Sequence, residues 1–187
     1  MHADGIVRGM TETQMTPVRQ VALAQPLLPA IAGAAAVALA IYQVATPGSP
    51  TATYDSPLDW IREVLFLSYL LASIASLRLA ARSGLATRWP ALLVSVGYGL
   101  ISVGAAYGMV TREDPEWFFF MAGPGQLLAI VGFIWFAISG LRRRVLPGWA
   151  ALLAGAGGTV AIIMAELGSS VLIGAFWLWV ASQSRRP

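Results

Sequence analysis

The chain has 187 residues, of which 57% are hydrophobic and only 11% charged, with a formal net charge of +3 and a mean hydropathy of +0.70. So little polar surface excludes an ordinary soluble domain and predicts a single all-α membrane domain. The chain also has no cysteine, no lysine and one histidine, His2. Thiolate, Schiff-base and histidine-ligated metal chemistry are thereby disfavoured, so we expect no cofactor and no metal site.

The two ends of the chain are more polar than its middle. Residues 1–20 show no apolar periodicity and are predicted to form a mobile cytoplasmic tail. Residues 21–183 are predicted to form one six-helix membrane domain, followed by a short basic cytoplasmic tail at 184–187. Within the domain, four apolar stretches have at least the roughly 20 residues that a bilayer core requires. They cover residues 21–44, 58–81, 89–110 and 117–141.

The second stretch carries charges at both of its ends. Arg62 and Glu63 are expected near the outer headgroups, while Arg78 and Arg82 can extend their long side chains to the inner surface. The third and fourth stretches each begin at a tryptophan, a residue enriched at membrane interfaces. These features favour four membrane spans before residue 145.

The last apolar block, residues 145–183, is compatible with one very long helix or with two short ones, and it has arginines at both ends. Because arginine-rich ends prefer the cytoplasm, the block is predicted to cross outward and return, with a turn near 165–170. Each leg would then have about 17 to 21 residues, enough for a bilayer core of roughly 30 Å. A five-span arrangement is the alternative.

The arginines decide the predicted orientation. Ten of the twelve fall on one side of the predicted spans, with only Arg62 and Arg112 on the other. These ten are Arg8, Arg19, Arg78, Arg82, Arg88, Arg142, Arg143, Arg144, Arg185 and Arg186. Short loops rich in arginine stay in the cytoplasm, so we expect a six-transmembrane-helix bundle in a bacterial-type inner membrane with both termini cytoplasmic. The basic balance then reflects orientation, and no nucleic-acid partner is expected.

Several polar residues are candidates for a ligand site. Glu166 is of interest because the turn that carries it is tight, and ionisable groups at membrane depth are frequently functional. Two stripes of polar side chains run along the second and third spans, where they either line a polar cleft or pack within the bundle. The stripes are Arg62, Tyr69, Ser73 and Ser76, and Ser95, Tyr98 and Ser102.

Glycines mark two further places. Gly97, Gly104 and Gly108 share one face of the third span, which predicts a close helix contact within the chain or with a second copy. In the fourth span, residues 123–126 read Gly-Pro-Gly-Gln. This sequence predicts either an ordinary proline kink or a broken helix whose freed backbone groups and Gln126 amide line a ligand site.

The first span has a smooth face of small residues, formed by Ala32, Ala36 and Ala40. Six short spans with both ends inside and an alanine-faced first helix resemble the substrate-capture subunits of energy-coupling-factor vitamin transporters. The resemblance covers the architecture and this one motif, and it aligns no binding residue.

The leading functional hypothesis is a small membrane protein that binds or moves a small amphipathic or apolar ligand or lipid. Its outward-opening pocket would lie near Arg62, Tyr69, Gln126 and Glu166. The alternative is a helper or scaffold subunit of a larger membrane complex, with membrane lipids, a second copy or a partner membrane subunit as its neighbours. A third possibility is a membrane enzyme that uses Glu166 as general base, with Arg62 holding an anionic headgroup.

Overall fold

The computed structural model describes residues 26–46, 54, 56–113, 116–164 and 167–183, and these residues form helices and short connections without any strand. The first four helices are α1 (Leu27–Ala45), α2 (Pro57–Arg82), α3 (Arg88–Thr111) and α4 (Phe118–Arg142). Each of the four is long and apolar enough to cross a membrane. The predicted all-α membrane protein is confirmed at this level.

The remaining helices are shorter. They are α5 (Gly148–Leu152), the π-helix η1 (Leu153–Gly157), α6 (Gly158–Ile163) and α7 (Ser170–Gln183). The first three follow one another without a break over Gly148–Ile163 and are about 24 Å long, while the 14 residues of α7 give about 21 Å. Both are shorter than the legs of about 17 to 21 residues that the sequence predicts.

The helices α2, α3 and α4 begin and end within one residue of their predicted bounds. The start of α2 is fixed by a capping box, in which the Asp59 amide donates to Ser56 Oγ at 3.3 Å and the Ser56 amide donates to Asp59 Oδ2 at 3.1 Å. Pro57 occupies the first turn, where a missing amide hydrogen costs no helical bond. Gly84 then adopts a φ of +80° in the turn to α3.

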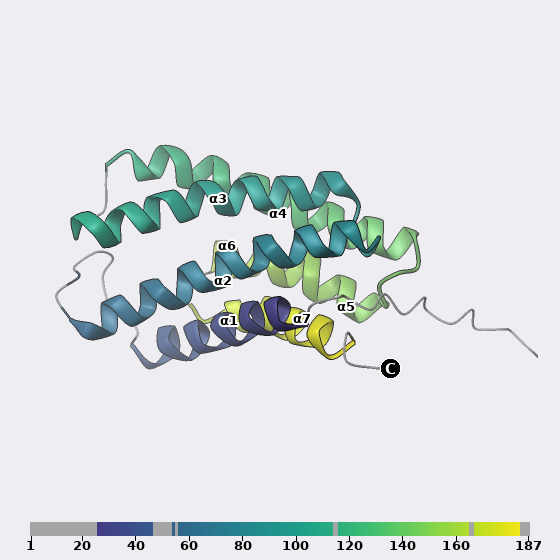
Figure 1. Cartoon of the computed structure of the whole chain (residues 1–187), viewed down its shortest axis with the longest axis horizontal. Helices are drawn as coiled ribbons and strands as arrows, with labels where there is room; N and C mark the ends of the chain where they lie inside the picture. The colour runs from purple at the N-terminus through teal and green to yellow at the C-terminus, as the bar shows by residue number, and fades with distance from the viewer. Residues whose placement is uncertain (1–25, 47–53, 55, 114–115, 165–166, 184–187) are drawn as a thin grey trace, which may run out of the picture.

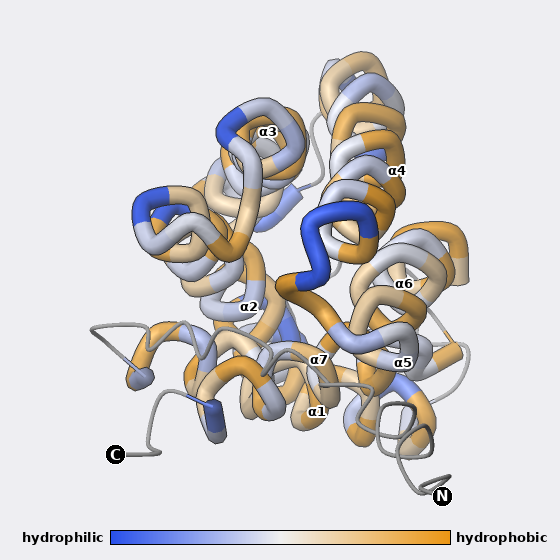
Figure 2. Tube along the Cα trace, turned by 90° about the vertical axis from the view of Figure 1, so that its right-hand side faces the viewer, coloured by the Kyte–Doolittle hydropathy of each residue, from blue (hydrophilic) through white to orange (hydrophobic). Residues whose placement is uncertain are grey.

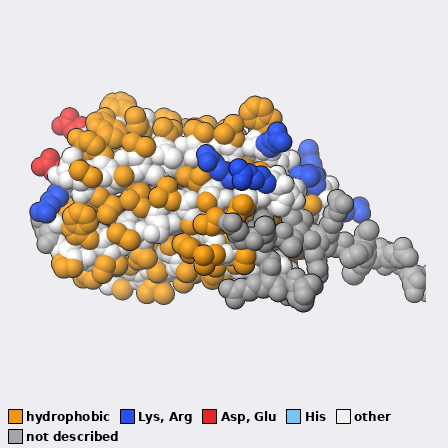
Figure 3. All heavy atoms as spheres, viewed as in Figure 1, with side chains coloured by type: hydrophobic (Ala, Val, Ile, Leu, Met, Phe, Trp, Pro, Cys, Tyr) orange, Lys and Arg blue, Asp and Glu red, His pale blue; other side chains and the backbone are white. Residues whose placement is uncertain are grey.

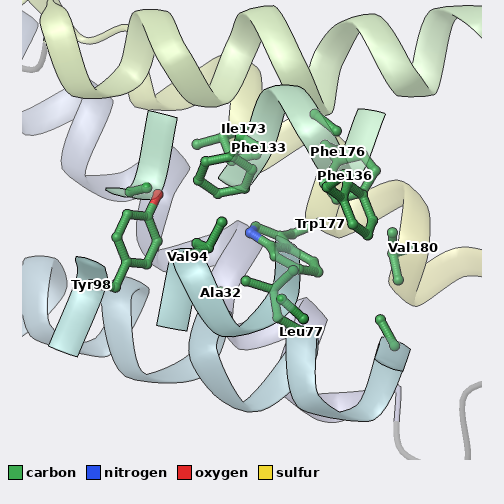
Figure 4. Close-up of a cluster of buried hydrophobic side chains, with 14 of the residues drawn as sticks. Ala32, Leu77, Val94, Tyr98, Phe133, Phe136, Ile173, Phe176, Trp177 and Val180 are labelled. Carbon is green, nitrogen blue, oxygen red and sulfur yellow. The ribbon is translucent and has the colours of Figure 1, made fainter. Parts of the chain in front are cut away.

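The helices form a ring, in which each element packs against its neighbours along the chain and the last returns to the first (Figures 1 and 2). In this ring α2 lies between α1 and α3, α4 follows α3, and η1 and α6 connect α4 to α7. The closing contact is between α1 and α7. The interior of the ring is filled by large side chains, several of them aromatic (Figure 4). Trp177, Phe133, Phe136, Phe176 and Tyr98 all belong to this core and are at most 1% exposed.

Charged side chains collect at the two ends of the bundle, and apolar side chains cover the surface between them (Figure 3). Helices α2 and α4 end at the same end of the bundle, and α3 and α5 begin there. We call it the arginine end because of the arginines that lie there. Its described arginines are Arg78, Arg82, Arg88, Arg142, Arg143 and Arg144. The opposite, acidic end carries Asp59, Glu63, Glu113 and Glu116 together with Arg62 and Arg112. This partition is the one that the sequence pattern predicts.

Candidate functional site

The tyrosines and serines of the two predicted polar stripes are buried inside the bundle. Tyr69 and Tyr98 are 4% and 1% exposed, and their hydroxyl groups form a hydrogen bond to each other. The ring of Tyr98 then packs edge-on against Phe133 of α4, with the ring centroids 5.7 Å apart. Tyr69 is therefore a buried packing residue, with its one polar atom already satisfied by Tyr98.

The serines of these stripes bond mostly to their own helices. Ser76, Ser95 and Ser102 each donate to the backbone carbonyl four residues earlier, at 2.7 Å. This is how a hydroxyl is satisfied in an apolar surrounding without a partner helix. Ser73 differs, because its Oγ is fully buried and has no hydrogen-bond partner among the described residues. These observations favour packing over a polar cleft for both stripes.

Arg62 lies near the acidic end of α2, seven residues before Tyr69. Its guanidinium forms an ion pair with the neighbouring Glu63, with an Nη2 to Oε1 distance of 3.1 Å. The two side chains are only 16% and 14% exposed. A ligand that used Arg62 would therefore compete with an existing carboxylate partner.

Gln126 lies on the outer surface of α4, eight residues after the helix begins, which is about 12 Å along its axis. Its amide has no hydrogen-bond partner among the described residues. It lines a shallow hollow of about 460 Å³, which we call the α4 hollow. The lining residues are Phe119, Phe120, Gly123, Pro124, Gln126, Leu127 and Ile130. Neither Arg62 nor Tyr69 lines the hollow, so the structure does not join these three predicted site residues in it.

The helix α4 continues through Pro124 from Phe118 to Arg142, so of the two predicted alternatives the broken helix is excluded and the proline is accommodated inside a continuous helix. Because Pro124 has no amide hydrogen, the carbonyl of Phe120 loses its usual donor four residues later. Phe120 and Pro124 both line the α4 hollow. One backbone acceptor and the Gln126 amide thus lie on the same apolar surface.

Glu166, a predicted site residue, lies outside the described residues. The residues after it are placed against α1. A Cβ on Gly168 would lie 3.0 Å from the Ala40 carbonyl oxygen, and the Ser170 hydroxyl donates to the Ala36 carbonyl at 3.0 Å. Ala40 is five residues before the end of α1, so Gly168 packs beside the side of that helix and not beyond its end.

The predicted glycine face of α3 packs against α4 of the same chain. A Cβ on Gly97 would lie 2.3 Å from the Gly125 carbonyl oxygen, and one on Gly104 would lie 1.9 Å from the ring of Phe118. Gly108 is buried on the same helix. At Gly97 the absence of a Cβ lets two backbones touch.

Two features of the interior escaped the sequence analysis. Gly155 of the π-helix η1 and Gly158, the first residue of α6, pack against α4, where a Cβ on Gly158 would lie 2.7 Å from the Phe133 ring. The Nε1 of Trp177 is buried without a hydrogen-bond partner in the described part of the chain, like Ser73 Oγ. The three glycines at positions 155, 157 and 158 could have indicated the close packing, but no local pattern indicates which core tryptophan lacks a partner.

The described residues contain no group of three or more metal-ligating side chains. Comparison with known proteins gives no further assignment, since no family model, no curated protein and no solved structure matches the chain. The α4 hollow and the distribution of charge are the features of the described residues that bear on function.

Proposed function

We propose that the chain is a six-span protein of a bacterial-type inner membrane, with both termini in the cytoplasm. The arginine end would face the cytoplasm, because short arginine-rich loops are retained there. The two shorter segments, Gly148–Ile163 and Ser170–Gln183, would be the fifth and sixth spans. Local thinning of the bilayer or the polar ends of these segments would compensate for their length.

We further propose that the protein binds an amphipathic or apolar membrane molecule in the α4 hollow. The observation that carries this proposal is the exposed, unpartnered amide of Gln126 in an otherwise apolar hollow about 12 Å from the start of α4. A polar group facing hydrocarbon is costly unless it is hydrogen-bonded. A ligand with a long apolar body and one hydrogen-bonding group would cover the aromatic rings and satisfy this amide.

The proposed site contains fewer of the predicted residues than the pocket expected from the sequence. Gln126 is the central polar contact, and Tyr69 supports the fold because its hydroxyl is already paired with Tyr98. Arg62 and Glu166 would contribute only if the ligand extends toward the acidic end. Replacing Glu166 with Gln tests that extension, and unchanged binding would remove Glu166 from the site.

The test is native mass spectrometry of the protein released from a mild detergent, with retained lipids identified by their masses. A Cβ on Gly123 would meet no atom within 4 Å, so Gly123→Leu fills the hollow without a clash inside the protein. Gly99 on α3 is equally open, which makes Gly99→Leu the matched control. We expect Gly123→Leu and Gln126→Leu to reduce the retained ligand, and Gly99→Leu to leave it unchanged. Equal retention by all variants would refute the site.

A helper or scaffold role is the second candidate, and the filled interior favours it. Core side chains such as Trp177 and Phe133 are fully buried, whereas Phe119 and Phe120 on α4 are 80% and 79% exposed. A partner helix could cover this surface and bond to Gln126. A photo-crosslinker at position 119 separates the two candidates, because it captures lipid in the first case and a defined membrane protein in the second.

A further inference from the structure

One exposed face of α2 changes from apolar to basic as it approaches the arginine end. Val64 and Leu71 are 50% and 55% exposed, and Arg78 follows at the same spacing of seven residues. Residues seven apart lie on nearly the same side of a helix. Arg78 is exposed too, as is Arg82 one turn later. The side of α2 that exposes Val64 and Leu71 thus also exposes both arginines near the end of the helix.

Neither arginine has a protein partner in the described part of the chain. The ion pair formed by described residues is that of Arg62 with Glu63, at the opposite end of α2. The described carboxylates, Asp59, Glu63, Glu113 and Glu116, all lie at the acidic end. Any anion that pairs with the guanidinium groups of Arg78 and Arg82 therefore comes from outside the described residues.

The position of the pair limits which anion can fit. Arg78 is four residues before the end of α2, about 6 Å inside the helix, so its side chain must extend along the lipid-facing surface to reach the headgroups. Arg82 lies on the same side one turn closer to the water. Two guanidinium groups stacked in this way match a phosphate held at the hydrocarbon boundary, because arginine binds phosphate oxygens in a bidentate manner.

We propose that Arg78 and Arg82 form a binding site for the headgroup of an anionic phospholipid at the arginine end. Charge favours an anionic over a zwitterionic headgroup, since six described arginines and no described carboxylate lie at this end. Trp89, which is 66% exposed at the start of α3, supplies an interfacial ring at the same end. The site is separate from the α4 hollow, and it stands whether or not that hollow binds a ligand.

Native mass spectrometry of the delipidated full chain tests the proposal, with phosphatidylglycerol and phosphatidylcholine of identical acyl chains as probes. The double variant Arg78→Gln/Arg82→Gln is compared with Arg142→Gln/Arg143→Gln, which removes the same charge from the same end. We expect the first variant to weaken phosphatidylglycerol binding about tenfold, roughly the effect of one charge-assisted hydrogen bond. The second variant should change it less than about twofold.

Other arms of the experiment can overturn the proposal. Equal losses in the two double variants would show only a general charge effect, and equal affinity for the two lipids would remove the anionic preference. Displacement of phosphatidylglycerol by millimolar inorganic phosphate would point to a free anion instead of a lipid. Arg78→Lys/Arg82→Lys should bind with intermediate affinity, because lysine keeps the charge but loses the planar fork. Both positions are exposed, and circular dichroism verifies that each variant is folded.

Discussion

The α3–α4 pair and the α1–α7 pair are both built around two glycines that face each other, yet they differ in length and in connection. In the first pair Gly97 and Gly125 are reciprocal, since a Cβ on either would lie within 2.8 Å of the other's carbonyl oxygen. In the second pair Gly33 and Gly174 are reciprocal, at 2.9 and 3.1 Å. The α3–α4 pair is formed by consecutive long helices, whereas α1 and α7 are the first and last described helices of the chain.

The difference indicates how the ring is closed. Consecutive helices are held together by a short connection, so their contact costs little chain entropy. The α1–α7 contact joins residues as far apart as Ala36 and Ser170, which are 134 positions apart. One of its two helices, α7, is shorter than α3 or α4, and its glycines approach each other less closely than Gly97 and Gly125 do. One hydrogen bond from a hydroxyl to a carbonyl joins α7 to α1. We therefore expect α1–α7 to tolerate change better than α3–α4, and to open first.

The glycines provide the largest expected effect. Gly97→Ala places a Cβ 2.3 Å from the Gly125 carbonyl oxygen and 2.8 Å from the Ala129 amide nitrogen, so two backbones must separate. We expect the free energy of unfolding, measured by denaturant titration in mixed micelles, to fall by about 3 kcal/mol. Gly33→Ala should cost about 1 to 2 kcal/mol, because α7 is short and can shift. Gly99→Ala, which meets no atom, should be neutral or stabilising. A larger loss at Gly33 than at Gly97 would reverse the comparison.

A buried tyrosine pair gives a second test of the contacts between consecutive helices, here α2 and α3. Tyr69 of α2 and Tyr98 of α3 satisfy each other's hydroxyl groups in the core. Either single change to Phe leaves one buried hydroxyl unpaired, and we expect a loss of about 1 to 2 kcal/mol in the free energy of unfolding. The double variant should lose less than the sum of the two singles, because both polar groups are then gone. Tyr107→Phe is the control, since Tyr107 is 45% exposed. Additive losses would show that the two hydroxyls are not coupled.

Sequence reasoning succeeded where a feature is set by local composition. The bounds of α2 were predicted from its apolar stretch and its terminal charges, and the structure adds the capping box of Ser56 and Asp59 at one end and the turn at Gly84 at the other. The glycine face of α3 was also predicted, because its spacing lies within one helix. Which helix would meet that face could not be predicted, since the Gly97–Gly125 contact depends on how two helices are placed in space.

The helices after residue 145 were predicted less well for a related reason. Charge predicted a turn near 165–170, and helices do flank that turn. The lengths of these helices depend on where the residues of the turn pack in space. Gly168 packs beside Ala40, five residues before the end of α1. For the candidate site, the sequence indicated Gln126 but also included Tyr69. The pairing of Tyr69 with Tyr98 became visible only once the two helices were placed.

The smallest expected effect concerns the polar contact that closes the ring. Ser170→Ala removes the hydrogen bond to the Ala36 carbonyl, and we expect a loss of about 0.6 kcal/mol, a typical value for such bonds between membrane helices. Ser73→Ala is the matched control, because its buried hydroxyl has no described partner and its removal should cost nothing or stabilise the protein. Hydrogen exchange should show the Ser170→Ala effect in α1 and α7 before α3 and α4, if closure is the weaker contact. Uniform exchange across all four helices would instead mean that the ring opens as a single unit, with both glycine pairs separating together.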